Sequence, residues 1–182
     1  AVMVHPCEVA RCVRLLAGTP VRVGTVAGFP LGQNTLAVKR HEIRDCLDQG
    51  AREIDLVMNV RALQAGGNAL VRDEMSALAT ACREAGAIGK IILETCYLTD
   101  DQKRAACRLA VEAGVDYVKT STGFGPAGAT AADVRLMAGA VAGRAKVKAA
   151  GGIRTLADAL AMVAAGASRL GCSSSVAIIQ AL

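Results

Sequence analysis

The sequence predicts an α/β chain of the (β/α)8 TIM-barrel class. Helix-like segments end in glycines that recur at spacings of 23 to 36 residues, and a short apolar, strand-like run follows each glycine. Such alternation of helices and strands predicts a parallel sheet. Two Phe, two Tyr and no Trp leave a core of Ala, Val, Leu and Ile, which suits such a sheet. Residues able to carry chemistry stand at the ends of several strands, which favours a barrel over a doubly wound sheet.

Seven strands are expected, one at the start of the chain and one after each helix-ending glycine. A glycine just past a helix adopts positive φ without a Cβ clash, so these positions are interpreted as left-handed helix caps. The glycines are Gly18, Gly50, Gly86, Gly114, Gly143 and Gly166. The expected strands span residues 2–5, 21–29, 53–59, 90–95, 116–122, 146–150 and 169–172.

Helices are expected between these strands. Thr99, Thr130 and Thr155 stand where an N-cap side chain would accept a hydrogen bond from the first helical turn. The expected helices span residues 36–49, 69–85, 100–113, 131–141 and 156–165, with a short apolar helix over 176–182.

The 182 residues are expected to form one domain, residues 1–182. A complete barrel of this class has eight strands in about 250 residues. We therefore expect the chain to be N-terminally truncated, with its first strand missing. The two strands beside the gap would then have unpaired edges.

Composition narrows the classes of function. The net charge of +5 comes from scattered arginines and not from a basic run, so no nucleic-acid partner is expected, whereas a phosphorylated substrate is compatible with it. The seven cysteines form no CxxC pair and no HxxxH spacing accompanies them, which indicates reduced thiols in a cytoplasmic protein and no metal site. The sequence shows no signal peptide and no long apolar stretch, so no membrane partner is expected.

Two lysines occupy unusual positions at apolar strands. Lys119 and Lys148 are each followed by a glycine-rich turn, although this chain has only six lysines against fifteen arginines. An ammonium in a core strand is costly unless it is paired or used. Lys119 could attack a carbonyl to form a Schiff base, with Lys148 on the next strand disfavouring its protonation. The structural alternative is that both side chains extend past the strand ends to water.

Asp55 places a carboxylate in the middle of an otherwise apolar strand, residues 53–59. Across a barrel from the two lysines, it could accept and return protons during cleavage of a carbon–carbon bond. The alternative is a salt-bridge partner that holds the lysines in place, and the two roles are compatible.

Three Gly- or Ser-rich segments follow the late strands, where barrels commonly bind phosphate. Each alone is a weak signal, because glycine after a strand is usually only a turn. Together they predict a phosphate site. The segments are Gly123-Phe124-Gly125, Gly151-Gly152-Ile153-Arg154 and Gly171-Cys172-Ser173-Ser174-Ser175.

These segments, together with three earlier motifs, resemble the motifs of the 2-deoxyribose-5-phosphate aldolase family. Its members are class I aldolases with a (β/α)8 barrel. The motifs occur in the family order and span nearly the whole chain. They are Gly28-Phe29-Pro30-Leu31-Gly32, the strand that contains Asp55, Ile92-Leu93-Glu94-Thr95, the Lys119 and Lys148 segments, and Gly171-Cys172-Ser173-Ser174.

The resemblance implies reversible cleavage of 2-deoxy-D-ribose 5-phosphate to D-glyceraldehyde 3-phosphate and acetaldehyde, without a metal or an organic cofactor. It implies that Lys119 is the nucleophile, that Lys148 tunes it and that Asp55 is the acid/base group. It also implies a homodimer, and it implies that this chain lacks an N-terminal helix as well as the first barrel strand. The implied phosphate-binding residues are Gly123, Gly151, Gly152, Arg154, Gly171, Ser173 and Ser174.

Two other functions stay open from the sequence. One is another Schiff-base or phosphate-binding barrel lyase or synthase, which would form an imine with a different carbonyl compound. The other is a catalytically inactive truncated barrel that acts as a binding protein. The presence of Lys119, Lys148 and Asp55 together is an argument against the second.

Overall fold

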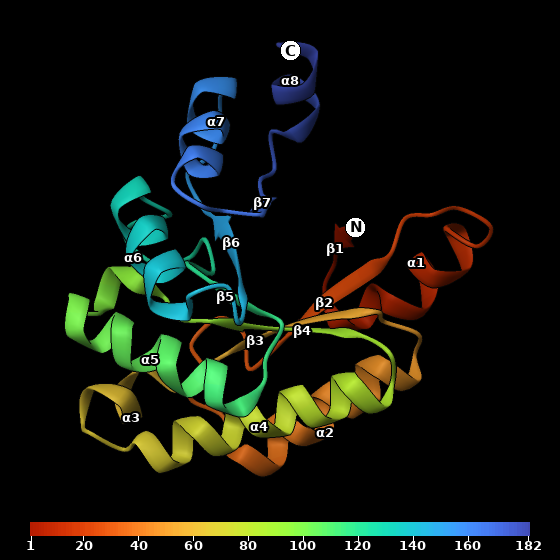
Figure 1. Ribbon diagram of the computed structural model, residues 1–182. Helices are drawn as coiled ribbons and strands as arrows, with labels where there is room; N and C mark the ends of the chain where they lie inside the picture. The colour runs from red at the N-terminus through yellow and green to blue at the C-terminus, as the bar shows by residue number, and fades with distance from the viewer.

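A computed structural model describes all 182 residues, and its centre is a parallel sheet that curls into an open half barrel (Figure 1). Each strand pairs with its neighbour in the chain, in the order β1 to β7. The strands are β1 (Val2–Met3), β2 (Val23–Ala27), β3 (Glu53–Val57), β4 (Ile88–Ile92), β5 (Tyr117–Lys119), β6 (Lys146–Ala150) and β7 (Arg169–Gly171). The predicted seven strands are confirmed, most of them shorter than expected.

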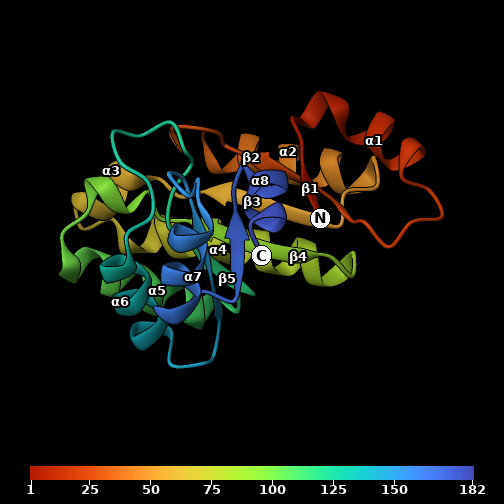
Figure 2. The ribbon, with the colours of Figure 1, turned by 90° about the horizontal axis from the view of Figure 1, so that it is seen from above.

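The half barrel is open along one side. Strand β1 pairs only with β2, and β7 pairs only with β6, so the sheet does not close on itself. Both chain ends lie on this open, concave side (Figures 1 and 2). The predicted pair of unpaired strand edges is therefore confirmed.

Helices follow most strands and cover the outside of the sheet. The five long helices agree with the prediction to within one residue at each end. Three short helices, η1, η2 and α3, were not predicted, because they are too short for apolar periodicity to show. The short helix α1 was indicated only by its cap glycine, Gly18. The helices are η1 (Pro6–Glu8), α1 (Val9–Leu15), α2 (Leu36–Asp48), α3 (Val60–Gln64), α4 (Asn68–Glu84), η2 (Thr95–Tyr97), α5 (Asp100–Ala113), α6 (Ala131–Val141), α7 (Leu156–Ala164) and α8 (Ser175–Gln180).

The predicted helix ends are confirmed by their geometry. The side chains of Thr99, Thr130 and Thr155 each accept a hydrogen bond from the backbone N–H three residues on. All six glycines that were interpreted as caps have positive φ, between 60° and 111°. No helix combines the length and the apolar character that a membrane crossing requires.

The two faces of the sheet differ in chemistry. On β3, Ile54 and Leu56 belong to a cluster of 35 buried apolar residues between the sheet and the helices, where α2 and α4 pack (Figure 1). Glu53 and Asp55 alternate with them, and their carboxylates pair with side chains of the neighbouring strands inside the half barrel. Period-two alternation thus directs the core outward and the charged groups inward.

Gly32 shapes the loop between β2 and α2, beside the open end of the half barrel. Its φ is +67°, and a Cβ atom there would lie 2.1 Å from the carbonyl oxygen of Met58. We expect Gly32→Ala to lower the free energy of unfolding by about 2 kcal/mol more than Gly66→Ala, because the clash adds to backbone strain. Gly66 is the matched control, since its φ is +79° and nothing lies within 4 Å of its Cβ position. Urea unfolding measures both, and equal losses would contradict the expected clash.

Candidate active site

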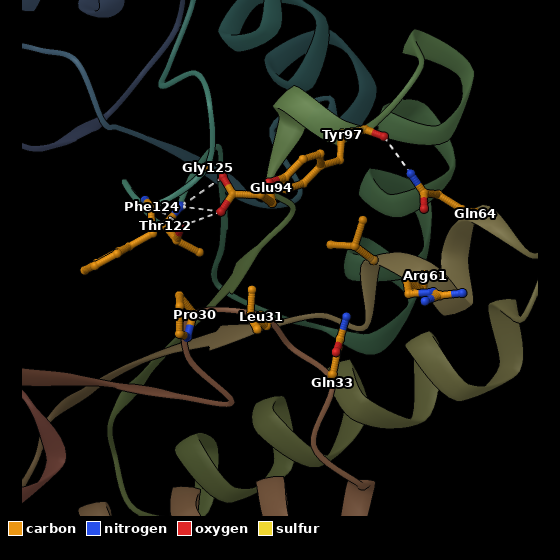
Figure 3. Close-up of a pocket in the computed structure, with 11 residues that line it drawn as sticks. Pro30, Leu31, Gln33, Arg61, Gln64, Glu94, Tyr97, Thr122, Phe124 and Gly125 are labelled. Carbon is orange, nitrogen blue, oxygen red and sulfur yellow. Dashed lines mark hydrogen bonds between the residues drawn. The ribbon is translucent and has the colours of Figure 1, made fainter.

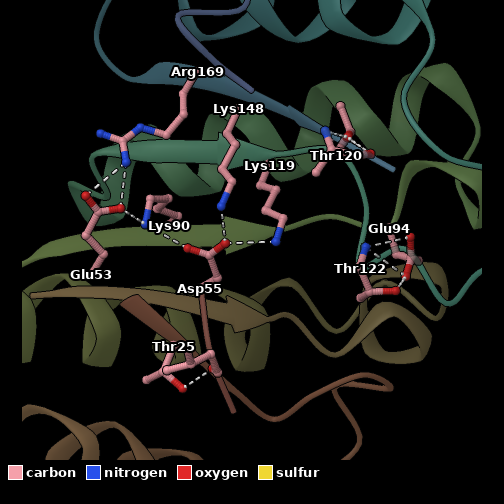
Figure 4. Close-up of polar contacts among 12 residues, drawn as sticks. Thr25, Glu53, Asp55, Lys90, Glu94, Lys119, Thr120, Thr122, Lys148 and Arg169 are labelled. Atoms are coloured by element: carbon pink, nitrogen blue, oxygen red, sulfur yellow. Dashed lines mark hydrogen bonds and ion pairs between the residues drawn. The ribbon is translucent and has the colours of Figure 1, made fainter. Parts of the chain in front are cut away.

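Three lysines converge on one carboxylate inside the half barrel (Figure 4). Asp55 Oδ2 accepts hydrogen bonds from Lys119 Nζ at 2.8 Å and from Lys148 Nζ at 2.7 Å. Asp55 Oδ1 accepts from Lys90 Nζ at 2.8 Å. The four residues come from the adjacent strands β3, β4, β5 and β6, and the parallel register places Asp55 beside Lys90 and Lys119 beside Lys148.

The predicted trio of Lys119, Lys148 and Asp55 is therefore brought together in one place. Lys119 is 6 % exposed and Lys148 is 2 % exposed, so neither side chain extends past its strand end to water. This geometry disagrees with the structural alternative raised from the sequence. Their chemical roles remain predictions at this point.

A second layer of charge, which was not predicted from the sequence, lies below Asp55. Glu53 binds Lys90 Nζ at 2.7 Å and one guanidinium nitrogen of Arg169 at 2.7 and 2.9 Å. Arg169 also lies over the ring of Tyr117, 5.4 Å from its centroid. A signal was available, because Glu53 lies two positions before Asp55 and must share its face. Lys90 carries no such signal, because only the register of β3 against β4 places it beside Asp55.

The charges shift the titration of this cluster. Burial by itself raises the pKa of Asp55, but the positive charges of Lys119, Lys148 and Lys90 outweigh it and hold that pKa well below its ordinary value. Burial lowers the pKa of Lys148 to about 8; Asp55 opposes this shift, whereas Lys119 and Lys90 add to it. Asp55 is therefore an ionised carboxylate near neutral pH, and Lys148 loses its proton at a pH where an ordinary lysine keeps it.

A cavity of about 760 Å³ opens above Lys119 and Lys148, between β1 and β7. Six of the seven predicted phosphate-binding residues line it, together with Arg169. Ser174 is not among the lining residues, and Ser175 takes part instead. The six are Gly123, Gly151, Gly152, Arg154, Gly171 and Ser173.

Backbone amides around this cavity are free to bind an anion. The N–H groups of Gly123, Gly151, Gly152 and Ser173 donate no hydrogen bond within the chain. Unpaired amides at strand ends and loop turns are the usual backbone ligands of phosphate. One rim of the cavity thus offers amides and an arginine, and its floor offers amines.

A second cavity of about 270 Å³ lies on the other side of the loop that follows β5 (Figure 3). Thr122 and Phe124 line both cavities, so this loop forms the wall between them. The rings of Phe29 and Phe124 make a T-shaped contact, with their centroids 5.4 Å apart and their planes at 88°. Neither cavity contains a group of three His, Cys, Asp or Glu side chains that could hold a metal ion.

Known proteins are similar to this chain in both sequence and fold. The profile of the DeoC/LacD family of aldolases matches residues 1–181. The chain belongs to this family. The family assignment predicted from the motifs is therefore confirmed, and so is the enzyme class, an aldolase.

Two bacterial relatives are similar over almost the whole chain. A deoxyribose-phosphate aldolase of Bacteroides thetaiotaomicron is 55% identical over 180 residues, which are 99% of this chain and 76% of the relative. A deoxyribose-phosphate aldolase of Streptococcus equi subsp. zooepidemicus is 51% identical over 180 residues, which are 99% of this chain and 81% of that relative.

Solved structures of aldolases have the same fold. An aldolase called QR15 superposes with a TM-score of 0.92 at 39% identity, covering 99% of this chain and 80% of its own. The deoxyribose phosphate aldolase of Aeropyrum pernix, described as a tetramer, gives a TM-score of 0.90 at 34% identity and covers 98% of this chain and 75% of its own. The predicted barrel class is confirmed by these superpositions.

Proposed function

We propose that the chain is a Schiff-base aldolase that reversibly cleaves 2-deoxy-D-ribose 5-phosphate into D-glyceraldehyde 3-phosphate and acetaldehyde. The observation that carries this proposal is the buried cluster of Lys119, Lys148 and Asp55 at the floor of a cavity with unpaired amides on its rim. The names of the relatives support the substrate.

Lys119 is the nucleophile in this proposal. Its neutral amine adds to the aldehyde carbon C1 of the substrate, and the carbinolamine loses water to give an imine. The imine draws electrons from the C2–C3 bond. As that bond breaks, the hydroxyl proton at C3 leaves, C3 becomes the aldehyde of glyceraldehyde 3-phosphate, and an enamine remains on Lys119. Protonation of the enamine at C2 and hydrolysis of the imine release acetaldehyde.

Asp55 and Lys148 assist Lys119. Asp55 is ionised in the resting site, so it is ready to accept a proton and to return it in a later step. Lys148 shares Asp55 Oδ2 with Lys119, so the two amines lie side by side, and in this proposal Lys148 tunes the nucleophile. The phosphate of the substrate binds the amides of Gly123, Gly151, Gly152 and Ser173 and the side chain of Arg154, with Gly171 and Ser174 in the surrounding loop.

Covalent capture tests the proposal. Incubation with acetaldehyde and borohydride is expected to leave a reduced ethyl adduct on the peptide that contains Lys119, and the sugar phosphate is expected to be cleaved without added metal or cofactor. An adduct that forms only with a different carbonyl compound would favour another barrel lyase or synthase. A folded protein that forms no adduct with any aldehyde would favour an inactive binding protein. Either result would refute the proposal.

The pH dependence of kcat tests the role of Lys148. Because the pKa of Lys148 is lowered to about 8, its cation is lost above that pH, and we expect kcat to fall about tenfold per pH unit there. Lys148→Arg keeps a cation at every accessible pH, so the surviving activity of this variant is expected to lack the alkaline fall. Superimposable alkaline limbs in wild type and variant would assign the fall to another group.

Two further proposals concern assembly and location. We propose that the chain forms a homodimer, since a structural relative is an oligomer. Light scattering after gel filtration measures the mass, and a monomer at micromolar concentration would refute the dimer. We also propose a cytoplasmic location, because all seven cysteines are free thiols, as is usual in a reducing compartment.

A further inference from the structure

Glu94 has an unusual backbone conformation at the end of β4. Its φ is 52° and its ψ is 65°, in the left-handed region that residues with a side chain rarely adopt. The other non-glycine residue with positive φ, Ala142, simply caps the C-terminus of α6. Glu94 instead stands at the rim of the half barrel, two residues beyond β4. Such a conformation persists only where surrounding contacts hold it.

The contacts of Glu94 all run to two segments beside the cavities. Its carboxylate accepts hydrogen bonds from the backbone N–H of Thr122 at 3.2 and 3.3 Å and from the hydroxyl of the same residue. The thiol of Cys96 donates to Oε1 at 3.9 Å. Figures 3 and 4 show the carboxylate pointing at the loop after β5.

Glu94 also differs from the other buried carboxylates in having no positively charged partner. Glu53, Asp55 and Glu74 each pair with at least one lysine. Glu94 is 4 % exposed and has no cationic partner. The donors to this buried carboxylate are the amide and hydroxyl of Thr122 and the weakly donating thiol of Cys96. The carboxylate therefore holds Thr122 firmly, because releasing it would leave a buried charge with only the thiol as a donor.

Thr122, which Glu94 holds, in turn fixes the conformation of the loop 122–125. Thr122 Oγ1 accepts a hydrogen bond from the N–H of Phe124 at 3.0 Å, and the N–H of Thr122 donates to Glu94, so the amides on both sides of Gly123 are occupied. The N–H groups of Gly123 and Gly125 donate no hydrogen bond within the chain. Gly123, with a φ of +94°, lines the cavity of Lys119, whereas Gly125 lines the second cavity. Gly125 packs closely against the same carboxylate, since a Cβ atom at this position would lie 3.3 Å from Glu94 Cδ.

We propose that Glu94 is a positioning residue for the anionic end of the substrate: its carboxylate holds Thr122 so that the free amide of Gly123 faces the phosphate. This inference rests on the proposed function for the identity of the anion. It assigns no contact between Glu94 and the substrate. In its left-handed backbone conformation, Glu94 directs its carboxylate at this loop (Figures 3 and 4).

Two variants separate the carboxylate from the backbone. Glu94→Gly removes the carboxylate and at the same time relieves the backbone, because glycine adopts this φ freely. Glu94→Gln keeps the shape and one acceptor oxygen, so it is expected to rescue part of the effect. Glu84→Gln is the matched control, because Glu84 is exposed and makes no side-chain hydrogen bond or ion pair.

The first measurement is the affinity for inorganic phosphate, by calorimetry at low ionic strength. We expect Glu94→Gly to raise the dissociation constant about tenfold, Glu94→Gln to raise it less, and Glu84→Gln to leave it unchanged. Amide hydrogen exchange of residues 120–126 is expected to speed up in Glu94→Gly. Wild-type affinity in a folded Glu94→Gly variant, or wild-type protein that binds no phosphate, would overturn the inference.

The second measurement separates positioning from a general structural role. The KM for 2-deoxyribose 5-phosphate is expected to rise about tenfold in Glu94→Gly, whereas kcat and the rate of acetaldehyde trapping at Lys119 stay within about threefold of wild type. Equal losses of phosphate binding and of acetaldehyde trapping would overturn the inference. Absence of any adduct on Lys119 in the wild type refutes the proposed function instead, and the phosphate titration still decides the role of Glu94.

Discussion

Replacing Lys119 by methionine is expected to abolish imine formation and to lower kcat/KM for aldol cleavage by about four orders of magnitude or more. Methionine fills a similar volume without an amine, so the nucleophile is lost while the packing remains. The fold is expected to survive, because a buried ammonium is replaced by an apolar group. Asp55 keeps its contacts with Lys90 and Lys148 in this variant.

The measurement combines a coupled assay for glyceraldehyde 3-phosphate with borohydride capture of acetaldehyde. Lys146→Met is the matched control, because Lys146 lies exposed at the start of β6, with its ammonium over the ring of Tyr117. It is expected to retain activity and the adduct. An ethyl adduct on Lys148 in the Lys119→Met protein would reverse the two assigned roles, and undiminished turnover would remove Lys119 from the chemistry.

Local signals in the sequence predicted most of the fold. The cap glycines, the capping threonines and the apolar periodicity of the long helices are short-range features, and each is present at its predicted position. The predicted strands are longer than the observed ones, because hydrogen bonds to the next strand continue past the last residue of the regular ladder. Leu93 and Thr95 show this, since their amides still bond to Lys119 and Thr120 beyond β4. The extent of pairing depends on the neighbouring strand and not on the strand's own residues.

The site was predictable only in part. Lys119, Lys148 and Asp55 stood out because each is a charge in an apolar run, which is a property of the sequence. Lys90 and Glu53 lie at the edges of their predicted strands, where a charge is unremarkable until the register places Lys90 against Asp55. Arg169 reaches Glu53 from 116 residues away in the chain, and no local pattern reports such a contact.

Asp55→Ala is expected to have the largest effect on stability of any substitution in the site. Three ammonium groups share this carboxylate, and only Lys90 has a second partner, Glu53. Breaking a buried ion pair from one side leaves uncompensated charge, so we expect the free energy of unfolding near neutral pH to fall by about 3 to 5 kcal/mol. Turnover is expected to fall by a factor of about 100 to 10,000, since proton transfer also loses its acceptor.

The pH dependence of unfolding isolates the charge of Asp55 from its volume. Its folded pKa is depressed, so its stabilising contribution is complete above the unfolded pKa of about 3.9 and is lost as the pH falls from there towards the folded pKa. Asp55→Asn keeps the shape without the charge, so the stability difference from wild type is expected to be full near neutral pH and to shrink in acid. Urea unfolding of both proteins between neutral pH and about pH 3 measures this difference. A difference that stays constant over that range would mean that Asp55 stabilises the half barrel by packing and not by binding the three lysines.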